Sequence, residues 1–309
     1  MNKRISNMEN MLTVALWQKA VVLYHEAQKQ GQELGRKRLA ELLNITDSLA
    51  RKIVFALNNQ DIINCTSMQL ETKEIKKELL IGDIHIPYQD KAAISVMLDY
   101  AEEYQPDIIS IMGDLIDCYE ISDFDKNPLR GKRLFEEIGE AREFLYSLRN
   151  RFPDSRIIYY LGNHEQRIER YICNKAEQLA ELVATLLIDK LELKELNVEY
   201  VTEPFAIGNL WHVHGNEKPK GAYNPQHICD VMMKYIYDDF VVFHYHRVQT
   251  QLYRRVGDRY FRAYSVGYLA KEFDYSKLNQ WQQGFATCEY DETGEFTFNQ
   301  KVIMRGVIH

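Results

Sequence analysis

The strongest indication of the fold is a short apolar run that ends in a glycine and two carboxylates, Gly113-Asp114-Leu115-Ile116-Asp117. Residues 107–112 are rich in β-branched side chains and follow a proline, which is typical of a buried strand. Side chains directly after such a strand lie at its C-terminal end, where open α/β sheets bind ligands. An aspartate at this position is also a common turn former or helix cap. The segment therefore predicts an α/β sheet and makes Asp114 and Asp117 either turn residues or ligands.

Length and charge narrow the class of protein. The 309 residues suffice for one large domain and a small one, and 46% hydrophobic with 27% charged residues is typical of a soluble globular protein. The formal net charge of −7 excludes a surface that binds polyanions all over. Aspartates gathered around a dication would themselves make the balance acidic, so a nucleic-acid substrate stays compatible with this charge.

The cysteines and the N-terminal residues bear on the compartment. The five cysteines are scattered and form no C-x-x-C pair, which indicates reduced thiols. Residues 1–9 lack the apolar core of a signal peptide, and no apolar run reaches membrane-spanning length. We expect a cytoplasmic protein without a membrane partner.

The first 70 residues form a separate predicted domain. Residues 10–30 carry apolar side chains at helical spacing, and residues 36–53 resemble a helix-turn-helix, with Asn44 in place of the commoner turn glycine. The outer face of its second helix would present Ser48, Arg51 and Lys52 to DNA. The alternative is a small helical domain used for dimerisation or docking, so a homodimer is one possible assembly.

From residue 76 to residue 309 the pattern alternates between strand and helix. Strands are predicted over 78–81, 108–112, 156–161, 198–201, 205–207, 210–213 and 240–243, and hairpins over 249–266 and 284–302. Helices are predicted over 92–104, 133–151, 165–187 and 226–237. This order predicts an α/β sandwich whose second half is mostly β.

Five motifs with metal-ligating side chains follow these predicted strands. They are Asp83-Ile84-His85, Gly113 to Asp117, Gly162-Asn163-His164-Glu165, His212-Val213-His214-Gly215 and His244-Tyr245-His246. The two-residue period of a strand would place paired ligands on one face. A lone histidine is most often a structural residue, but six at strand ends indicate a metal site. Mixed histidine, aspartate and asparagine ligands favour Mn²⁺, Fe or Zn²⁺ over Mg²⁺ or Ca²⁺.

The set D-x-H, G-D-x-x-D, G-N-H-E, H-G and H-x-H, in this order, resembles the calcineurin-like metallophosphoesterase superfamily from about residue 78 onwards. Residues 83–88, 122–128 and 281–285 are similar to a phage and bacterial branch of it. The resemblance implies a four-layer α/β/β/α sandwich, here preceded by the small all-α domain. One departure is Phe243, which stands where the family usually has glycine and could alter the loop or narrow the cleft.

The resemblance also implies two ligand sets for two divalent ions, with Mn²⁺ the first expectation and Fe or Zn²⁺ as alternatives. The first ligand set is Asp83, His85, Asp114 and His246, and the second ligand set is Asp114, Asn163, His214 and His244. The ions would lie about 3.5–4 Å apart and share a hydroxide that attacks phosphorus. His212 faces the same way as His214 and could replace it, but the match to H-G favours His214.

Further roles follow from the same resemblance. His164 would act as the general acid, and Asp117 would orient His164 unless it is simply a helix cap. Glu165 is expected at a helix N-terminus. Arg247 and Arg167 are candidates to bind the substrate phosphate, with surface salt bridges as the alternative.

The sequence therefore predicts a dinuclear-metal phosphoesterase that cleaves phosphodiester bonds, with nucleic acid as the expected substrate. The alternative is a phosphomonoesterase or a small-nucleotide phosphodiesterase whose N-terminal domain serves assembly. A third hypothesis is a non-catalytic DNA-binding regulator. The resemblance to protein phosphatases is weaker, because Cys118-Tyr119 replaces their Arg-Gly after the second aspartate of G-D-x-x-D.

Overall fold

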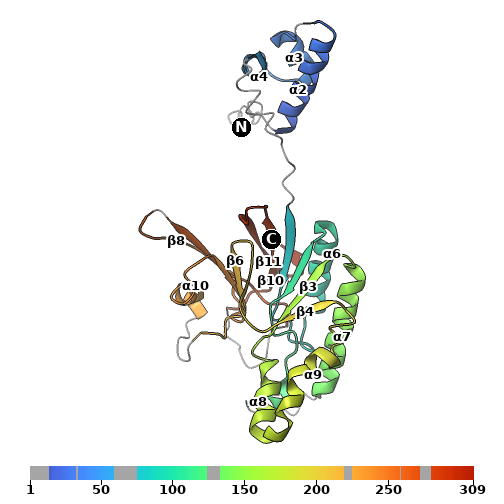
Figure 1. The fold of residues 1–309 in the computed structure, drawn as a ribbon, viewed down its shortest axis with the longest axis vertical. Helices are drawn as coiled ribbons and strands as arrows, with labels where there is room; N and C mark the ends of the chain where they lie inside the picture. The colour runs from blue at the N-terminus through green and yellow to red at the C-terminus, as the bar shows by residue number, and fades with distance from the viewer. Residues whose placement is uncertain are drawn as a thin grey trace. The chain divides into compact units, whose positions relative to one another are not determined.

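A computed structural model describes residues 14–32, 34–58, 75–123, 133–218, 225–257, 259–271 and 280–309 (Figure 1). The chain divides into two compact units, Met1–Lys73 and Glu74–His309. Residues 10–13 of the first predicted helix and residues 124–128 of the 122–128 segment lie outside the described residues. None of the described helices is long and apolar enough to cross a membrane.

The described part of the N-terminal unit contains three helices, α2 (Val14–Lys29), α3 (Arg36–Leu43) and α4 (Asp47–Asn58), around a small apolar core. Leu39, Ala50 and Ile53 are buried in that core. The turn between α3 and α4 begins at Asn44, which takes a left-handed conformation with φ of 51°. Asparagine tolerates this conformation better than most residues, so it can replace glycine here. The hydroxyl of Thr46 accepts a hydrogen bond from the Leu49 amide at 3.3 Å and so caps α4.

The second unit contains a seven-stranded sheet. Its parallel half comprises β1 (Lys76–Ile81), β2 (Ile108–Ile111), β3 (Arg156–Tyr160) and β4 (Val198–Val201). Antiparallel strands β10 (Gly284–Tyr290), β11 (Phe296–Met304) and β12 (Val307–Ile308) extend it beyond β1. The helices α6 (Lys91–Tyr104) and α7 (Leu134–Arg151) connect the first three parallel strands. The carboxyl ends of β1, β2 and β3 therefore meet at one edge of the sheet.

A five-stranded sheet has the order β5-β6-β7-β9-β8. Its strands are β5 (Phe205–Ile207), β6 (Leu210–Val213), β7 (Phe240–Val242), β8 (Gln249–Arg254) and β9 (Tyr260–Ser265). β6, β7 and β9 are parallel to one another. The short helices η3 (Pro225–His227) and α10 (Ile228–Met232) lie between β6 and β7 in the chain.

Successive side chains of a strand point to opposite faces of its sheet, and so they pack in different layers of the domain. Leu79 and Ile81 of β1 pack with the helices, whereas Leu80 packs in the core between the two sheets. On β7, Val241 joins that inter-sheet core, and Val242 packs in a third core with α10. Figure 1 shows α6, α7 and α9 along one sheet and α10 beside the other. The predicted four-layer α/β/β/α sandwich is confirmed.

Two predicted helices are shorter than expected. The helix predicted over 165–187 consists of α8 (Gln166–Lys175), the 3₁₀ helix η2 (Glu177–Leu182) and α9 (Val183–Lys190), because Ala176 leaves the helical region with φ of −154°. The helix predicted over 226–237 keeps α-helical form only over Ile228–Met232 and continues as turns. β12, in turn, was not predicted.

Candidate metal centre

The predicted ligands follow the carboxyl ends of strands in both sheets. Asp83 and His85 follow β1, Asp114 follows β2 and Asn163 follows β3. His214 follows β6, and His244 and His246 follow β7 in the second sheet. The first two loops run side by side, because the Asp83 amide donates to the Gly113 carbonyl and the His85 amide to the Asp114 carbonyl. The two sheets thus present their loops to a common site.

The backbone of these loops is left-handed where the ligands stand. φ is 49–50° at Asp83, His85 and Asp114, 68° at His244 and 57° at His246. These residues therefore do not follow the two-residue period that was predicted, because the strands end at Ile81 and Val242 and left-handed turns orient the ligands instead. Each such residue costs about 1–3 kcal/mol and is typical of functional sites.

The first ligand set is closely packed and buried. Nε2 of His85 lies 3.2 Å from Nε2 of His246, and Nε2 of His246 lies 3.5 Å from Oδ1 of Asp83. Oδ1 of Asp83 is buried without a hydrogen-bond donor among the described residues. Two imidazole nitrogens and a carboxylate oxygen that face one another without sufficient donors suit a shared cation.

The second ligand set converges on Asp114. Nε2 of His214 lies 3.3 Å from Oδ2 of Asp114 and 3.1 Å from Oδ1 of Asn163. Ligand atoms of Asp114, His214 and His244 all lie within 4.8 Å of one another. Oδ2 of Asp114 is also 3.9 Å from Nε2 of His85, so this carboxylate lies between the two sets.

The electrostatics of the centre favour a cation. Burial alone would lower the pKa of His214, but Asp114 raises it to about 10. Burial and the neighbouring His214 lower the pKa of His244 to about 3, so the His244 imidazole is neutral and keeps a lone pair. A bound dication would satisfy the same carboxylates that now stabilise positive charge on His214. The clusters therefore fit divalent metal ions, and the assignment of each ligand stays a prediction.

His164 and Asp117 lie beside Asp114. Nδ1 of His164 is 3.1 Å from Oδ1 of Asp117, and Nε2 of His164 is 3.7 Å from Oδ2 of Asp114. Oδ1 of Asp117 is also 3.1 Å from Nδ1 of His85, a contact that the sequence did not predict. Burial would raise the pKa of Asp117, but hydrogen bonds from His164 and His85 hold it below its ordinary value. Asp117 thus remains charged and contacts one predicted metal ligand as well as the predicted acid.

The two arginines differ in their contacts. Arg167 donates from Nη1 to the Asp117 carbonyl at 2.8 Å, and its Nη2 lies 2.9 Å from Nε2 of His164. Among the described residues, Arg167 therefore contacts Asp117 and His164 in the candidate metal centre. The alternative of a surface salt bridge is not what these contacts show. Arg247 donates from Nη1 to Oε1 of Gln280 at 2.9 Å, while its Nε is buried without a partner among the described residues.

Glu165 has a role that the sequence did not reveal. It stands at the N-terminus of α8 as predicted, but its buried carboxylate turns inward. Oε2 accepts the amides of Gly162 and Asp114, and Oε1 accepts the Ile116 amide and the Tyr159 hydroxyl. A single side chain thus ties the loop after β3 to the loop after β2.

Glycine is required before Asn163 for a related reason. A Cβ on Gly162 would lie 2.2 Å from the Asp114 amide nitrogen, a distance that no side chain can occupy. The close approach of these two loops places Asn163 beside the shared aspartate.

His212 and Phe243 lie away from the ligands. Nε2 of His212 is 3.1 Å from Oε1 of the buried Glu78, and its ring stacks on Phe205. Phe243 is fully buried between the sheets and packs against Gly82, where an added Cβ would meet the phenyl ring at 2.7 Å. Its burial in this core gives no support to the expectation that Phe243 narrows the cleft. Between His212 and His214, only His214 lies with the second ligand set.

Glu217 was also missed in the sequence. Its carboxylate accepts the amides of His214 and Gly215 and the hydroxyl of Tyr160. It therefore fixes the loop that carries His214. An acidic residue three positions after the histidine was the only signal, and it is too common to be informative.

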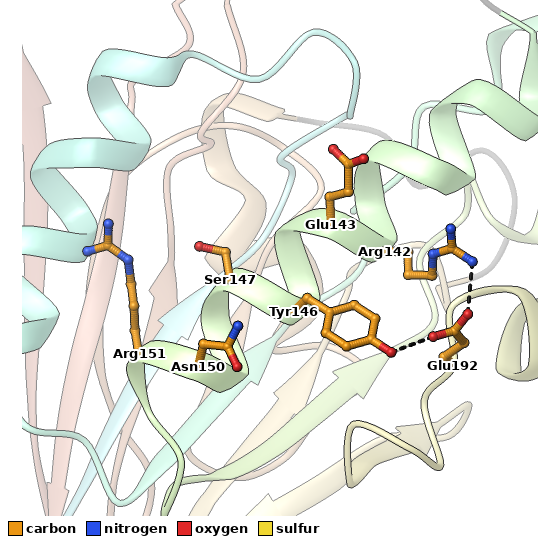
Figure 2. A pocket seen from close by; sticks show the side chains of 7 residues that line it. All are labelled: Arg142, Glu143, Tyr146, Ser147, Asn150, Arg151 and Glu192. Atoms are coloured by element: carbon orange, nitrogen blue, oxygen red, sulfur yellow. Dashed lines mark hydrogen bonds and ion pairs between the residues drawn. The ribbon is translucent and has the colours of Figure 1, made fainter.

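The three predicted DNA contacts, Ser48, Arg51 and Lys52, lie exposed on α4. Arg51 pairs with Asp47 at 3.7 Å. A pocket on α7 has none of the predicted site residues in its lining. Figure 2 shows the side chains that line it, which are Arg142, Glu143, Tyr146, Ser147, Asn150, Arg151 and Glu192. Within it, Glu192 accepts from Arg142 and from the Tyr146 hydroxyl, so its charge is already paired.

Comparison with known proteins identifies related chains. A family model described as calcineurin-like phosphoesterase matches residues 77–275. The Gene 54 protein of Mycobacterium phage L5 is 27% identical over 146 residues, which are 46% of this chain and 57% of that protein's length. Vps29 of Entamoeba histolytica, solved with Zn²⁺, is 16% identical with a TM-score of 0.41, and the match covers 75% of this chain and 96% of that one. The phosphoesterase YfcE of E. coli is 12% identical with a TM-score of 0.31, and the match covers 72% and 97%.

Proposed function

The chain belongs to the calcineurin-like phosphoesterase family, and we propose that it is a metal-dependent phosphoester hydrolase that cleaves phosphodiester bonds in nucleic acid. The observation that carries this proposal is the position of Asp114. Its Oδ2 lies 3.3 Å from Nε2 of His214, 3.7 Å from Nε2 of His164 and 3.9 Å from Nε2 of His85. One carboxylate oxygen is thus shared by both ligand sets and by the proposed acid.

The first and second ligand sets would each hold one cation, with Mn²⁺ the first candidate because the ligands mix nitrogen and oxygen. Two such cations, when bound, would supply the activation of a water molecule and the neutralisation of charge on the phosphoryl oxygens. The protein contributes the placement of the ligands, which the left-handed loops and the carboxylates of Glu165 and Glu217 hold in position.

His164 would supply the proton that the leaving oxygen needs. The alkoxide released from a nucleic-acid diester is strongly basic, so its departure gains from general acid catalysis. Burial would lower the pKa of His164, but the charges of Asp114 and Asp117 raise it above its ordinary value. The Asp117 carboxylate holds Nδ1 and leaves Nε2 directed toward Asp114 and Arg167.

Arg167 would bind the substrate phosphate next to His164. In the structure its Nη2 reaches Nε2 of His164, which is the atom that would face the leaving oxygen. A guanidinium in this place can contact a non-bridging phosphoryl oxygen and support the same transition state.

The N-terminal unit supports nucleic acid as the substrate. Ser48, Arg51 and Lys52 lie at positions i, i+3 and i+4 of α4, so they share one exposed face. A short helix that presents such a face can enter a major groove. This unit would hold duplex DNA near the phosphoesterase unit.

The substrate class is tested by offering the purified protein, with Mn²⁺, labelled single- and double-stranded DNA, RNA, a chromogenic diester and a chromogenic monoester. We expect turnover of nucleic acid and of the chromogenic diester, and loss of both in Asp114→Asn. Turnover of the monoester alone would contradict the proposal and support the phosphomonoesterase alternative.

The role of the N-terminal unit is tested separately by binding. The double variant Arg51→Ala/Lys52→Ala should weaken duplex DNA binding about tenfold and reduce its salt dependence. Lys19→Ala/Lys29→Ala removes the same charge from exposed positions of α2 and is the matched control. Equal affinities of all three proteins would make the N-terminal unit an assembly module.

A further inference from the structure

Three aromatic side chains form a cluster at the edge of the candidate metal centre, and two of them contact His246. Tyr88 follows β1, Tyr268 follows β9 and Trp281 precedes β10, and they pack in one small cluster with Ala270. We call Tyr88, Tyr268 and Trp281 the aromatic cluster. Tyr88 and Trp281 belong to the segments 83–88 and 281–285, and neither residue is a predicted metal ligand. The predicted metal centre therefore does not account for these aromatic residues.

Two of the three rings, those of Tyr268 and Trp281, contact His246 directly. The ring of Tyr268 stacks on the imidazole of His246 with centroids 4.8 Å apart and an interplanar angle of 12°. The indole of Trp281 meets the same imidazole at 4.8 Å and 75°. Tyr268 is buried, whereas Trp281 remains partly exposed. Tyr268 therefore supports the ligand from behind, and Trp281 extends the site toward solvent.

Backbone hydrogen bonds fix the position of the indole. The Gln282 amide donates to the His246 carbonyl at 2.8 Å, and the Tyr268 amide donates to the Gln282 carbonyl at 3.1 Å. The side-chain oxygen of Gln282 accepts the Val248 amide at 2.9 Å. Trp281 is thus held between two segments on a rigid frame, which a recognition site requires.

Arg247 adds a charge beside the aromatic cluster. It follows His246 directly, and its Nη1 donates to Oε1 of Gln280, the residue before Trp281. Its Nε is buried with no partner in the described part of the chain. The Arg247 side chain therefore contacts the segment that carries Trp281.

We propose that Trp281 is a stacking platform for the base of the nucleotide next to the scissile phosphodiester, and that Arg247 binds the adjoining backbone phosphate. This inference rests on the proposed function and narrows its substrate to nucleic acid that is single-stranded at the cleavage position. A base inside a duplex stacks on its neighbours, so only an unpaired base can stack on a protein ring. Aromatic rings paired with cationic side chains are the usual means of holding single strands.

The test measures binding of two octanucleotides to the Mn²⁺-loaded full chain by fluorescence anisotropy. One is octathymidylate, and the other has the same backbone with abasic residues at the four central positions. Trp281→Ala should weaken binding of octathymidylate about tenfold, leave the abasic strand unchanged, and Trp281→Phe should restore most of the loss. Trp211→Ala, which removes a partly exposed indole from β6, is the matched control and should bind both strands like the unaltered protein.

Two outcomes would contradict the proposal that Trp281 is a stacking platform. Unchanged affinity of Trp281→Ala for octathymidylate would show that no base stacks there, and an equal loss for both strands would show that Trp281 only supports His246. Gel analysis of the same samples reports cleavage separately. Base-dependent binding without cleavage of any strand would refute the proposed nuclease activity and leave the platform in place.

Discussion

Asp117 and His164 face each other with Oδ1 of the carboxylate 3.1 Å from Nδ1 of the imidazole. The backbone carbonyl of Asp117 lies 2.8 Å from the same nitrogen. Two acceptors from one residue fix both the tautomer and the orientation of the ring. Nε2 of His164 is thereby left to face Arg167, whose Nη2 lies 2.9 Å away, and Asp114.

Replacing Asp117 by Asn should lower phosphodiester turnover about 10–100-fold, because the amide cannot stabilise an imidazolium as a carboxylate does. Metal content at saturating Mn²⁺, measured by atomic emission, should stay near that of the unaltered protein, since Asp117 contacts the ligand His85 but lies outside both ligand sets. Asp154→Asn, at an exposed position, is the control. The helix that follows begins after Cys118 and has no side-chain cap, so Asp117 is not the helix cap that the sequence also allowed. An unchanged turnover number would show that Asp117 does not assist His164 in the reaction.

His164→Ala should lower turnover of a DNA diester by about 10²–10⁴-fold, the usual range for a general acid. A diester with a nitrophenolate leaving group should lose far less, because that group departs without a proton. Both turnover numbers and the metal content are measured on one preparation. Loss of metal together with activity would instead identify His164 as a ligand.

Removing the metals should destabilise the protein, because a cation bound by the buried carboxylates of Asp83 and Asp114 stabilises the native state and not the unfolded chain. Mn²⁺ at 100 times its dissociation constant should add about 2.7 kcal/mol to the free energy of unfolding. The measurement is Tm with Mn²⁺ and with a chelator. Asp114→Asn should show little of this difference, and a full Mn²⁺ response in that variant would argue against a shared ligand.

The strands of the site could be predicted from the sequence because strand formation depends on the side chains within each short segment. Residues 108–111 form the predicted strand because β-branched side chains suit a sheet that is covered on both faces. The carboxylates after it could be placed at the sheet edge before any contact was known. The family resemblance then supplied the grouping of the ligands, which composition alone could not give.

The sequence could not show how the ligands are oriented. A period of two predicted like-facing side chains at Asp83 and His85, whereas both residues have positive φ beyond the end of β1. For the same reason His212 remained an alternative to His214. The structure distinguishes them because β6 ends at Val213, so His212 stays in the sheet and binds Glu78.

The sequence also could not predict contacts between residues that are far apart in the chain. Glu165 binds the Asp114 amide across 51 positions, and Trp281 meets His246 across 35. No local pattern marks such pairs, because they depend on how two loops approach in the folded chain. These residues had to be found in the structure.

Glu165→Gln should lower the free energy of unfolding by about 2–4 kcal/mol. The glutamine amide nitrogen would face two buried donors that the carboxylate now accepts, and each unsatisfied donor costs about 1–3 kcal/mol. Urea unfolding in the presence of a chelator measures the effect without metal binding. Glu169→Gln, exposed on the same helix α8, should change stability by less than about 0.5 kcal/mol. Equal stabilities of the two variants would contradict the proposed connection between the loops.

Glu137→Gln should make stability less dependent on pH. Burial on α7 and the charge of Asp117 raise the pKa of Glu137 from 4.5 to about 8. Between these values the native state keeps a proton that the unfolded state has released, so stability falls as pH rises, by at most about 1.4 kcal/mol per pH unit. We therefore expect Tm of the chelated protein to fall more between pH 5 and pH 8 than Tm of Glu137→Gln. Glu143→Gln, exposed on the same helix, should keep the full pH dependence, and parallel curves for all three proteins would show that Glu137 is ionised in the native state.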